Sequence, residues 1–192
     1  MTHYLGLTGS IGMGKSTTAQ MFRDAGIPVW DADATVHQLY SQNGAAVPEI
    51  AKVYPDAIVA GAVSRSKLKD IISTDPSALH KLEHIVHPLV ALDRERFIKQ
   101  HEGPLLVFDI PLLFETGADA WLSSVLVVTA PPDIQKDRVL ARPGMTTAQL
   151  DQILRRQMPD ADKRARADHV IETLTLDETR AAVQELILEL TG

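Results

Sequence analysis

The sequence contains no cysteine, and it has no apolar run of the roughly eighteen residues that a membrane-spanning helix needs. Without cysteine the chain cannot form a disulfide framework or a thiolate zinc site, and this suits a reducing cytoplasm. The start of the chain has neither a basic segment nor a long apolar core. We therefore expect a cytoplasmic protein that is neither exported nor held in a membrane.

The charge balance is acidic, with 19 lysine and arginine residues against 25 aspartate and glutamate residues and a formal net charge of −6. This disfavours a broad surface for nucleic acid, although a local basic pocket for a phosphorylated small molecule fits it. The length of 192 residues, 45% of them hydrophobic, allows one α/β core with inserted subdomains. Small-molecule chemistry is the default interpretation, and the oligomeric state stays open.

The most informative motif is Gly-Ser-Ile-Gly-Met-Gly-Lys-Ser at residues 9–16, which fits the phosphate-loop pattern G-x-x-x-x-G-K-[ST]. It follows an apolar run at residues 4–8 and precedes a helical stretch from Lys15 to Ala25 that Gly26 should end. A loop at a helix N-terminus favours anions. A chance glycine-rich turn is the alternative, but strand, loop, Lys-Ser and helix all occur in the required order.

In such a loop the backbone N–H groups point at phosphates, Lys15 reaches the β- and γ-phosphates, and the Ser16 hydroxyl holds Mg²⁺. The sequence therefore predicts ATP and Mg²⁺ as cofactors. The loop residues expected at the nucleotide are Gly9, Gly12, Met13, Gly14, Lys15, Ser16 and Thr17.

Short apolar segments alternate with helical stretches, which is the pattern of a mostly parallel sheet covered on both faces. Five segments have strand composition: residues 4–8, 27–31, 105–109, 124–129 and 169–172. We predict an α/β protein with a three-layer phosphate-loop kinase fold and a five-stranded, mostly parallel sheet.

Two helical regions interrupt the strands. In the first, at residues 36–102, Asp75 should cap a helix that ends at His87-Pro88, where another begins. In the second, a helix over residues 132–142 should end at Pro143-Gly144. Thr146 and Gln149 then form a capping box for the next helix, and Asp177 caps a final amphipathic helix.

Three carboxylates follow strands, where open α/β sheets place ligand-contacting groups. Asp31 and Asp33 lie two residues apart, so in extended chain both could face one reacting centre, one as base and one orienting Mg²⁺. The alternative for Asp33 is a cap of the helix at residues 34–40. Asp109 ends the third predicted strand, where such enzymes often support the metal. The alternative role of Asp109 is to cap the turn that follows the strand.

Arginines gather around Pro143-Gly144. Arg138 and Arg142 share a helix face, and Arg155-Arg156 follow in the next helix. A mobile lid carrying arginines would neutralise charge on the transferred phosphoryl group and exclude water. Singly, each arginine would more often be a solvated surface charge.

Further motifs follow one another along nearly the whole chain. They are residues 7–17, 26–29 and 31–33, Leu82-Glu83 with His87-Pro88, residues 111–115, Gln135 with Arg138 and Arg142, Gln157, and Ala167-Asp168 followed by Val170-Ile171. In this order they resemble the dephospho-coenzyme A kinases. The resemblance implies that ATP with Mg²⁺ phosphorylates the ribose 3′-hydroxyl of dephospho-coenzyme A, the last step of coenzyme A synthesis.

The resemblance also implies roles for particular residues. Asp33 becomes the base on the 3′-hydroxyl, with Lys15 and Arg142 as its catalytic partners and Arg65 and His87 as acceptor contacts. Ser16, Asp31 and Asp109, indicated already by the loop and the strand ends, are the expected metal site. The implied organisation is a nucleotide-binding core of residues 1–35, 103–137 and 165–192, a helical acceptor-binding subdomain of residues 36–102, and a lid of residues 138–164.

The sequence departs from the family pattern at two places. Ser64-Arg65 replaces a usual Asp-Arg pair, and serine should preserve the helix cap there. Glu172-Thr173 stands where many members carry asparagine, which puts an adenine contact by that side chain in doubt.

Other readings share part of this pattern. A nucleoside, shikimate or adenylate-type kinase would have the same loop, carboxylates and lid, and would differ in the insertion. A GTPase switch should show Asn-Lys-x-Asp and Asp-x-x-Gly, and neither motif is present. A non-catalytic ATP-dependent assembly protein is disfavoured because the chain has no large surface module.

Overall fold

The structure, a computed structural model, describes residues 2–192 and divides into two compact units. We call the residues up to Asp31 together with His101–Gly192 the sheet unit, and Ala32–Gln100 the helical unit. The helical unit is thus one continuous insertion between two parts of the sheet unit. Among the described residues, no helix has the length and apolar character needed to cross a membrane.

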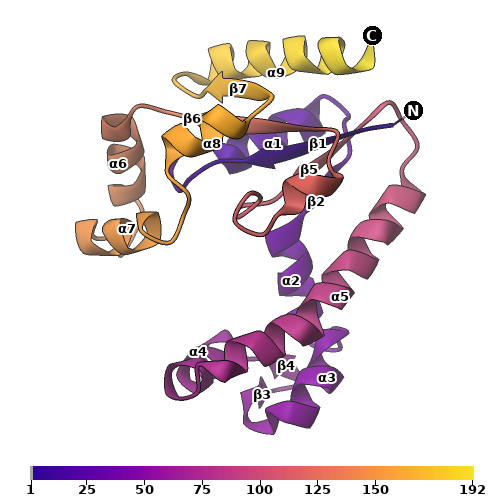
Figure 1. The fold of residues 1–192 in the computed structure, drawn as a ribbon, viewed down its shortest axis with the longest axis vertical. Coiled ribbons are helices and arrows are strands. Elements are labelled where there is room, and N and C mark those ends of the chain that lie inside the picture. Colours follow the sequence, from indigo (N-terminus) through magenta and orange to yellow (C-terminus); the bar gives the residue numbers. More distant parts are fainter. Residues whose placement is uncertain (1) are drawn as a thin grey trace. The chain divides into compact units, whose positions relative to one another are not determined.

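The sheet unit is built on a parallel five-stranded sheet in the order β2-β5-β1-β6-β7 (Figure 1). Its strands are β1 His3–Thr8, β2 Val29–Asp31, β5 Leu105–Asp109, β6 Ser124–Thr129 and β7 His169–Glu172. β5 and β6 are buried along their whole length, as expected for a parallel sheet covered on both faces. The predicted α/β fold and its five parallel strands are confirmed, although β2 begins at Val29 rather than Ile27.

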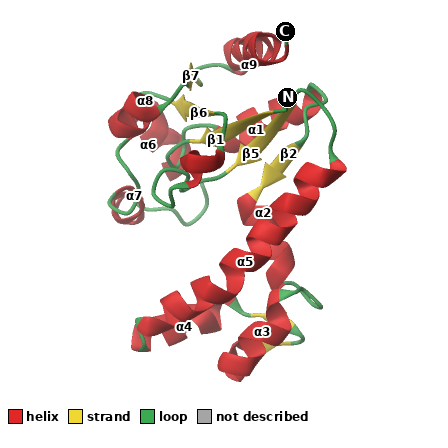
Figure 2. Cartoon of the chain, turned by 45° about the vertical axis from the view of Figure 1, so that its right-hand side comes forward, coloured by secondary structure: helices red, strands yellow, loops and turns green. Residues whose placement is uncertain are grey.

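Helices and turns cover both faces of this sheet (Figure 2). They are α1 Lys15–Asp24, η2 Ala118–Trp121, α6 Pro132–Leu140, α7 Thr147–Leu154, α8 Asp160–Arg166 and α9 Leu176–Thr191. Alternate strand residues face α1 and α9, so Leu7, Val107 and Phe22 share one buried cluster with Val183 of α9. On the opposite face the Phe108 ring contacts Trp30 and Trp121, at centroid distances of 6.1 and 4.9 Å.

The helical unit contains four α-helices and a two-stranded hairpin within its described range, Ala32–Gln100. Its elements are α2 Ala32–Tyr40, α3 Ala46–Val53, η1 Pro55–Ala57, β3 Ile58–Val59, β4 Ala62–Val63, α4 Arg65–Thr74 and α5 Ser77–Gln100. Ile50, Leu68, Leu82 and Val86 form its buried core. The antiparallel hairpin was not predicted, since its strands are only two residues long.

The predicted break at His87-Pro88 is wrong, because α5 continues through Pro88 to Gln100. Proline costs a helix interior about 3 kcal/mol, since it has no N–H to donate. Packing on both sides of Pro88 offsets this cost. Leu82 is buried before it, and after it Asp93 accepts a 3.0 Å hydrogen bond from Thr35 of α2.

Most local helix signals hold. Asp75 accepts a 2.9 Å hydrogen bond from the Ser77 N–H at the start of α5, and Thr146 and Gln149 form the predicted capping box of α7. Gly26 adopts the left-handed conformation after α1. Ser64 caps α4, as expected for the substitution of the usual aspartate. The cap assigned to Asp177 is wrong: Thr175 caps α9, and Asp177 lies inside its first turn.

Candidate nucleotide and phosphoryl-transfer site

The phosphate loop links β1 to α1 and follows a path that side chains would obstruct. Gly12 and Gly14 have φ angles of 78° and 87°, in the left-handed region that favours glycine. A Cβ atom on Gly14 would also lie 2.9 Å from the Thr173 Oγ1. Thr173, just after β7, donates a 2.8 Å hydrogen bond to the Met13 carbonyl, so the loop rests directly on the end of β7.

Lys15 points back to the sheet, where its ammonium donates a hydrogen bond to Asp109 Oδ1 at the end of β5. Asp31 ends β2 in register with Asp109 on the neighbouring strand. Burial raises the pKa of Asp109, the Lys15 ammonium opposes this rise, and the nearby Asp31 carboxylate adds to it. The structure thus brings one cation and two carboxylates together at the carboxyl edge of the sheet, as the strand pattern predicts.

These residues fit a magnesium ion. Mg²⁺ in phosphate-binding sites often uses one or two carboxylates together with the oxygens of the substrate phosphates. Asp31 and Asp109 supply such a pair, and the exposed Ser16 hydroxyl follows Lys15 at the start of α1. Within residues 2–192 no cluster of three or more histidine, aspartate or glutamate side chains offers a protein-only metal cage.

Arg23 is a neighbour that the sequence did not suggest. Its guanidinium lies 4.0 Å from Asp31 Oδ2, and it also lowers the pKa of Asp109 slightly against the effect of burial. It occupies the last turn of α1. The packing of α1 places Arg23 on the helix face toward β2. No local pattern in the sequence indicates that Arg23 lies near Asp31.

A pocket of about 260 Å³ lies on the other side of the phosphate loop. It is lined by the loop residues Gly12, Gly14 and Thr17, by Arg138 and Arg142 of the predicted lid, and by residues 173–176 after β7. Arg138 donates to the Thr173 carbonyl and, at 3.0 Å, to the Thr173 Oγ1. The predicted helix over residues 132–142 is too long: α6 ends at Leu140, so Arg142 lies in the following turn and does not share a helix face with Arg138. Both arginines nevertheless line the same cavity as the loop.

The remaining predicted lid arginines lie elsewhere. Arg155 and Arg156 are exposed and follow α7 in a turn, so they are not on the helix as predicted. Arg155 is instead the C-cap residue of α7.

Three predicted acceptor residues belong to the helical unit. Asp33 is exposed in the first turn of α2, which begins at Ala32, so Asp33 is not the cap of a helix at residues 34–40. Arg65 is exposed at the start of α4, with its guanidinium 5.8 Å from the centroid of the Tyr40 ring. Burial raises the pKa of Tyr40, and Arg65 partly opposes the rise. His87 is exposed on α5, one residue before Pro88.

Two glutamines noted only as sequence marks also contact the phosphate loop. Gln135 of α6 donates a 2.8 Å hydrogen bond to the Ile11 carbonyl, and Gln157 accepts a 3.2 Å hydrogen bond from the Ile11 N–H. Each is far from Ile11 in the sequence. No local pattern indicates these contacts.

The comparisons with known proteins agree along the whole chain. A family model described as dephospho-CoA kinase matches residues 3–178. A dephospho-CoA kinase of Ruegeria pomeroyi is 58% identical over 190 residues, covering 99% of this chain and 96% of its own. Among solved structures, a Thermus thermophilus protein has a TM-score of 0.88 at 36% identity, covering 100% of this chain and 99% of its own. The dephospho-CoA kinase of Campylobacter jejuni shares the fold, with a TM-score of 0.72 at 23% identity over 100% and 98% of the two chains.

Proposed function

The chain belongs to the dephospho-CoA kinase family, and from this premise we propose how its residues carry out the reaction. The enzyme transfers the γ-phosphoryl group of ATP to the ribose 3′-hydroxyl of dephospho-coenzyme A, giving coenzyme A and ADP. This is the last step of coenzyme A biosynthesis. The observation that carries the assignment of residues is the meeting of the phosphate loop, Lys15 and two carboxylates at one sheet edge.

ATP binds with its phosphates on the loop of residues 9–17 and its adenosine part in the pocket beside Arg138. The pocket starts at Gly12 and Gly14 and ends at residues 173–176, so it continues directly from the phosphate loop. Thr173 belongs to the Glu172-Thr173 pair that stands where many family members carry asparagine. Because its hydroxyl bonds to the Met13 carbonyl, Thr173 supports the loop. Its own N–H and carbonyl are bonded to the Thr129 carbonyl and to Arg138, so a backbone contact to the base would come from residues 174–176.

Mg²⁺ would be held by Ser16, Asp31 and Asp109, and when bound it neutralises charge on the phosphates. The chain's own contribution is to keep both carboxylates fixed. Asp109 is 2% exposed, with Lys15 as its counter-ion, and Asp31 is placed by its strand register opposite Asp109.

Asp33 accepts the proton of the 3′-hydroxyl. It is exposed in the first turn of α2 and is not the helix cap, so its structural contribution is limited to its interaction with the helix dipole, about 0.3–1 kcal/mol. It follows Asp31 by two residues in the sequence. The helical unit, close in extent to the predicted acceptor-binding subdomain of residues 36–102, supplies Arg65 and His87 for dephospho-coenzyme A.

The segment of residues 138–164 acts as a lid, and Arg142 stabilises charge on the phosphoryl group during transfer. Support comes from the pocket, where Arg142 lies exposed across from the phosphate loop. A cytoplasmic location stays a prediction, as does the absence of nucleic-acid partners.

The test is an acceptor screen. The protein is incubated with ATP, Mg²⁺ and separate hydroxyl acceptors, namely dephospho-coenzyme A, shikimate, adenosine and AMP, and each product is identified by mass. Only dephospho-coenzyme A should gain a phosphoryl group. Efficient phosphorylation of another acceptor, or ATP hydrolysis with no acceptor preference, would contradict the assignment.

A further inference from the structure

The backbone of Ile11, in the middle of the phosphate loop, is held by two glutamine side chains at once. The Gln135 amide donates to the Ile11 carbonyl at 2.8 Å, and the Gln157 amide oxygen accepts from the Ile11 N–H at 3.2 Å. Gln135 is 8% exposed. Both polar groups of one loop residue are therefore bonded to side chains from outside the loop.

These two bonds fix the orientation of successive peptide groups. In a planar trans peptide the carbonyl and the N–H point in opposite directions. Because Gln135 holds the Ile11 carbonyl, the Gly12 N–H of the same peptide points away from Gln135. Because Gln157 holds the Ile11 N–H, the Ser10 carbonyl points the other way, where it accepts a 3.2 Å hydrogen bond from the Met13 N–H.

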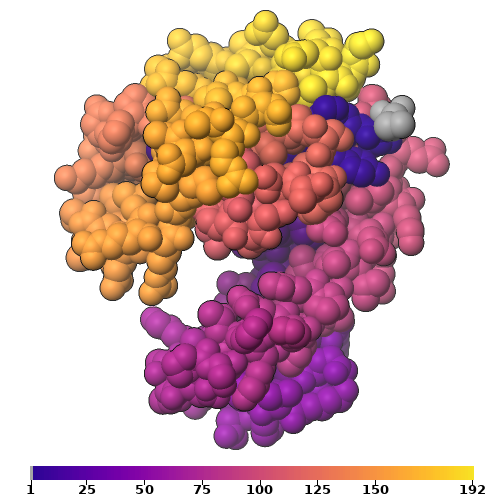
Figure 3. Space-filling view, viewed as in Figure 1, coloured from indigo at the N-terminus to yellow at the C-terminus, as the bar shows by residue number. Residues whose placement is uncertain are grey.

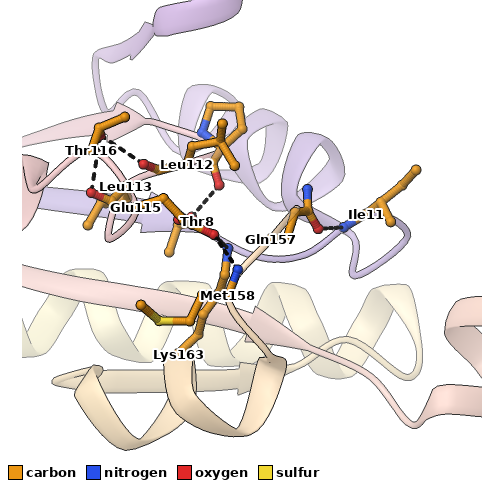
Figure 4. A network of polar contacts seen from close by, with 10 residues as sticks. Thr8, Ile11, Leu112, Leu113, Glu115, Thr116, Gln157, Met158 and Lys163 are labelled. Carbon is orange, nitrogen blue, oxygen red and sulfur yellow. Dashed lines mark hydrogen bonds and ion pairs between the residues drawn. The ribbon is translucent and has the colours of Figure 1, made fainter. Parts of the chain in front are cut away.

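The chain just after Gln157 is held by an ion pair between Glu115 and the buried Lys163 (Figure 4). Glu115 Oε1 accepts a 2.7 Å hydrogen bond from the N–H of Met158, the residue after Gln157, and lies 3.1 Å from Lys163 Nζ. The Lys163 side chain is 0% exposed. Figure 3 shows α8, which carries Lys163, lying against the segment that follows β5. Burial raises the pKa of Glu115, but the Met158 N–H, its own N–H and Lys163 outweigh this and hold that pKa below its ordinary value.

The glutamines also bracket the arginine-bearing segment. Gln135 precedes Arg138 on α6, and Gln157 follows α7, so both ends of this segment meet the loop at the same residue. We propose that Gln135 and Gln157 are positioning residues that hold the Gly12 N–H toward the triphosphate, with the Glu115–Lys163 pair keeping Gln157 in place. This inference rests on the proposed function and adds the residues that shape its phosphate site.

The test uses Gln135→Met and Gln157→Met, which keep the side-chain volume and remove the hydrogen bond. Loss of a bond that orients a partly buried peptide of the phosphate loop should weaken ATP binding about tenfold in each variant. Adenosine lacks phosphates, so its dissociation constant should stay within twofold of the wild type. The KM for ATP should rise with the dissociation constant, while the KM for dephospho-coenzyme A stays unchanged.

The matched control is Gln152→Met, at an exposed glutamine of α7 in the same segment, which should leave ATP binding unchanged. The proposal is overturned if both test variants bind ATP within twofold of the wild type. It is also overturned if ATP and adenosine weaken equally, because the glutamines would then only support the fold. If the buried Gln135→Met variant does not fold, the half-buried Gln157 carries the test alone.

The acceptor screen and the measurements of ATP and adenosine binding separate this inference from the proposed function. Failure of the wild type to phosphorylate dephospho-coenzyme A would remove the proposed function. Selective loss of ATP binding in the two variants would still assign the glutamines to a triphosphate site.

Discussion

Lys15 of the phosphate loop is bonded to Asp109 of β5, so the cation expected at the phosphates already has a carboxylate partner within the sheet unit. A triphosphate must share this ammonium with Asp109. The pair thereby links the nucleotide site to the strand end that we assign to the metal. It also means that changes at Lys15 act on Asp109 as well as on ATP.

Lys15→Ala and Ser16→Ala should both fold and lose most phosphoryl transfer. The first removes a phosphate contact and the second a metal ligand, and loss of one such charge-stabilising group typically lowers kcat about a hundred- to a thousandfold. Steady-state rates at saturating ATP and Mg²⁺ measure this. Near-normal turnover in either variant would remove that residue from the site.

Lys15→Ala should also change how stability depends on pH. Burial already raises the pKa of Asp109 above its ordinary 3.8, and loss of Lys15 raises it further. The folded state then binds a proton that the unfolded state releases, so stability falls as pH rises from about 4 through the raised pKa. Denaturant unfolding between pH 4 and 7 should show this decline in Lys15→Ala. The double variant Lys15→Ala with Asp109→Asn should lack it, and an equal decline there would contradict the role of Asp109.

Arg142→Ala and Arg138→Ala should have different effects. Arg142 is exposed at the pocket, so its loss should lower kcat more than ATP affinity. Arg138 also bonds to Thr173, so its loss should weaken ATP binding and reduce stability by about 2 kcal/mol. Kinetics and thermal unfolding of both variants distinguish the two roles. Weak ATP binding with unchanged kcat in Arg142→Ala would assign that arginine to ground-state binding.

Asp33→Asn tests the catalytic base. The exposed side chain lies inside the first turn of α2 and does not cap it, so stability should change by less than about 1 kcal/mol. The rate should fall about a hundred- to ten-thousandfold if the carboxylate accepts the 3′-hydroxyl proton. Both quantities are measured on one preparation with dephospho-coenzyme A. A stable variant with kcat within a few fold of the wild type would exclude Asp33 as the base.

Glu115→Gln should destabilise the protein by about 3 kcal/mol, because it leaves the fully buried Lys163 without its counter-ion. In the wild type the pKa of Glu115 is below its ordinary 4.5. Its stabilisation is therefore complete above about pH 4.5 and is lost as pH falls through the lower folded pKa. The control is Asp119→Asn, which breaks the more exposed pair with Arg166, leaves Arg166 in contact with the Phe114 ring, and should cost less than about 1 kcal/mol. Equal losses in both variants would contradict a special role for the buried pair.

Local signals in the sequence predicted much of this structure. The five strands, the phosphate loop, the Asp75 cap and the Thr146–Gln149 capping box all depend on neighbouring residues. Such features need only residue types at fixed short spacings. The pairing of Lys15 with Asp109 was also within reach, because both residues belong to the carboxyl edge of a parallel sheet.

The failures have tertiary causes. α5 passes through Pro88 because packing before and after the proline offsets its unfavourable effect on the helix. The sequence shows the proline but does not show this packing. The hairpin at Ile58–Val63 has strands too short for a periodic pattern. Gln135 and Gln157 reach Ile11 across 124 and 146 residues, a relation that only the folded chain reveals.

The place of β5 in the sheet sets an order for folding during synthesis. β5 lies between β1 and β2 and pairs with both, yet the whole helical unit precedes it in the chain. As a continuous stretch with its own core, that unit leaves the ribosome before either early strand has a partner. The phosphate loop is thus translated among the first residues and acquires its supporting sheet only after Leu105 has emerged. A nascent chain that stalls before this point lacks the strand that joins β1 to β2.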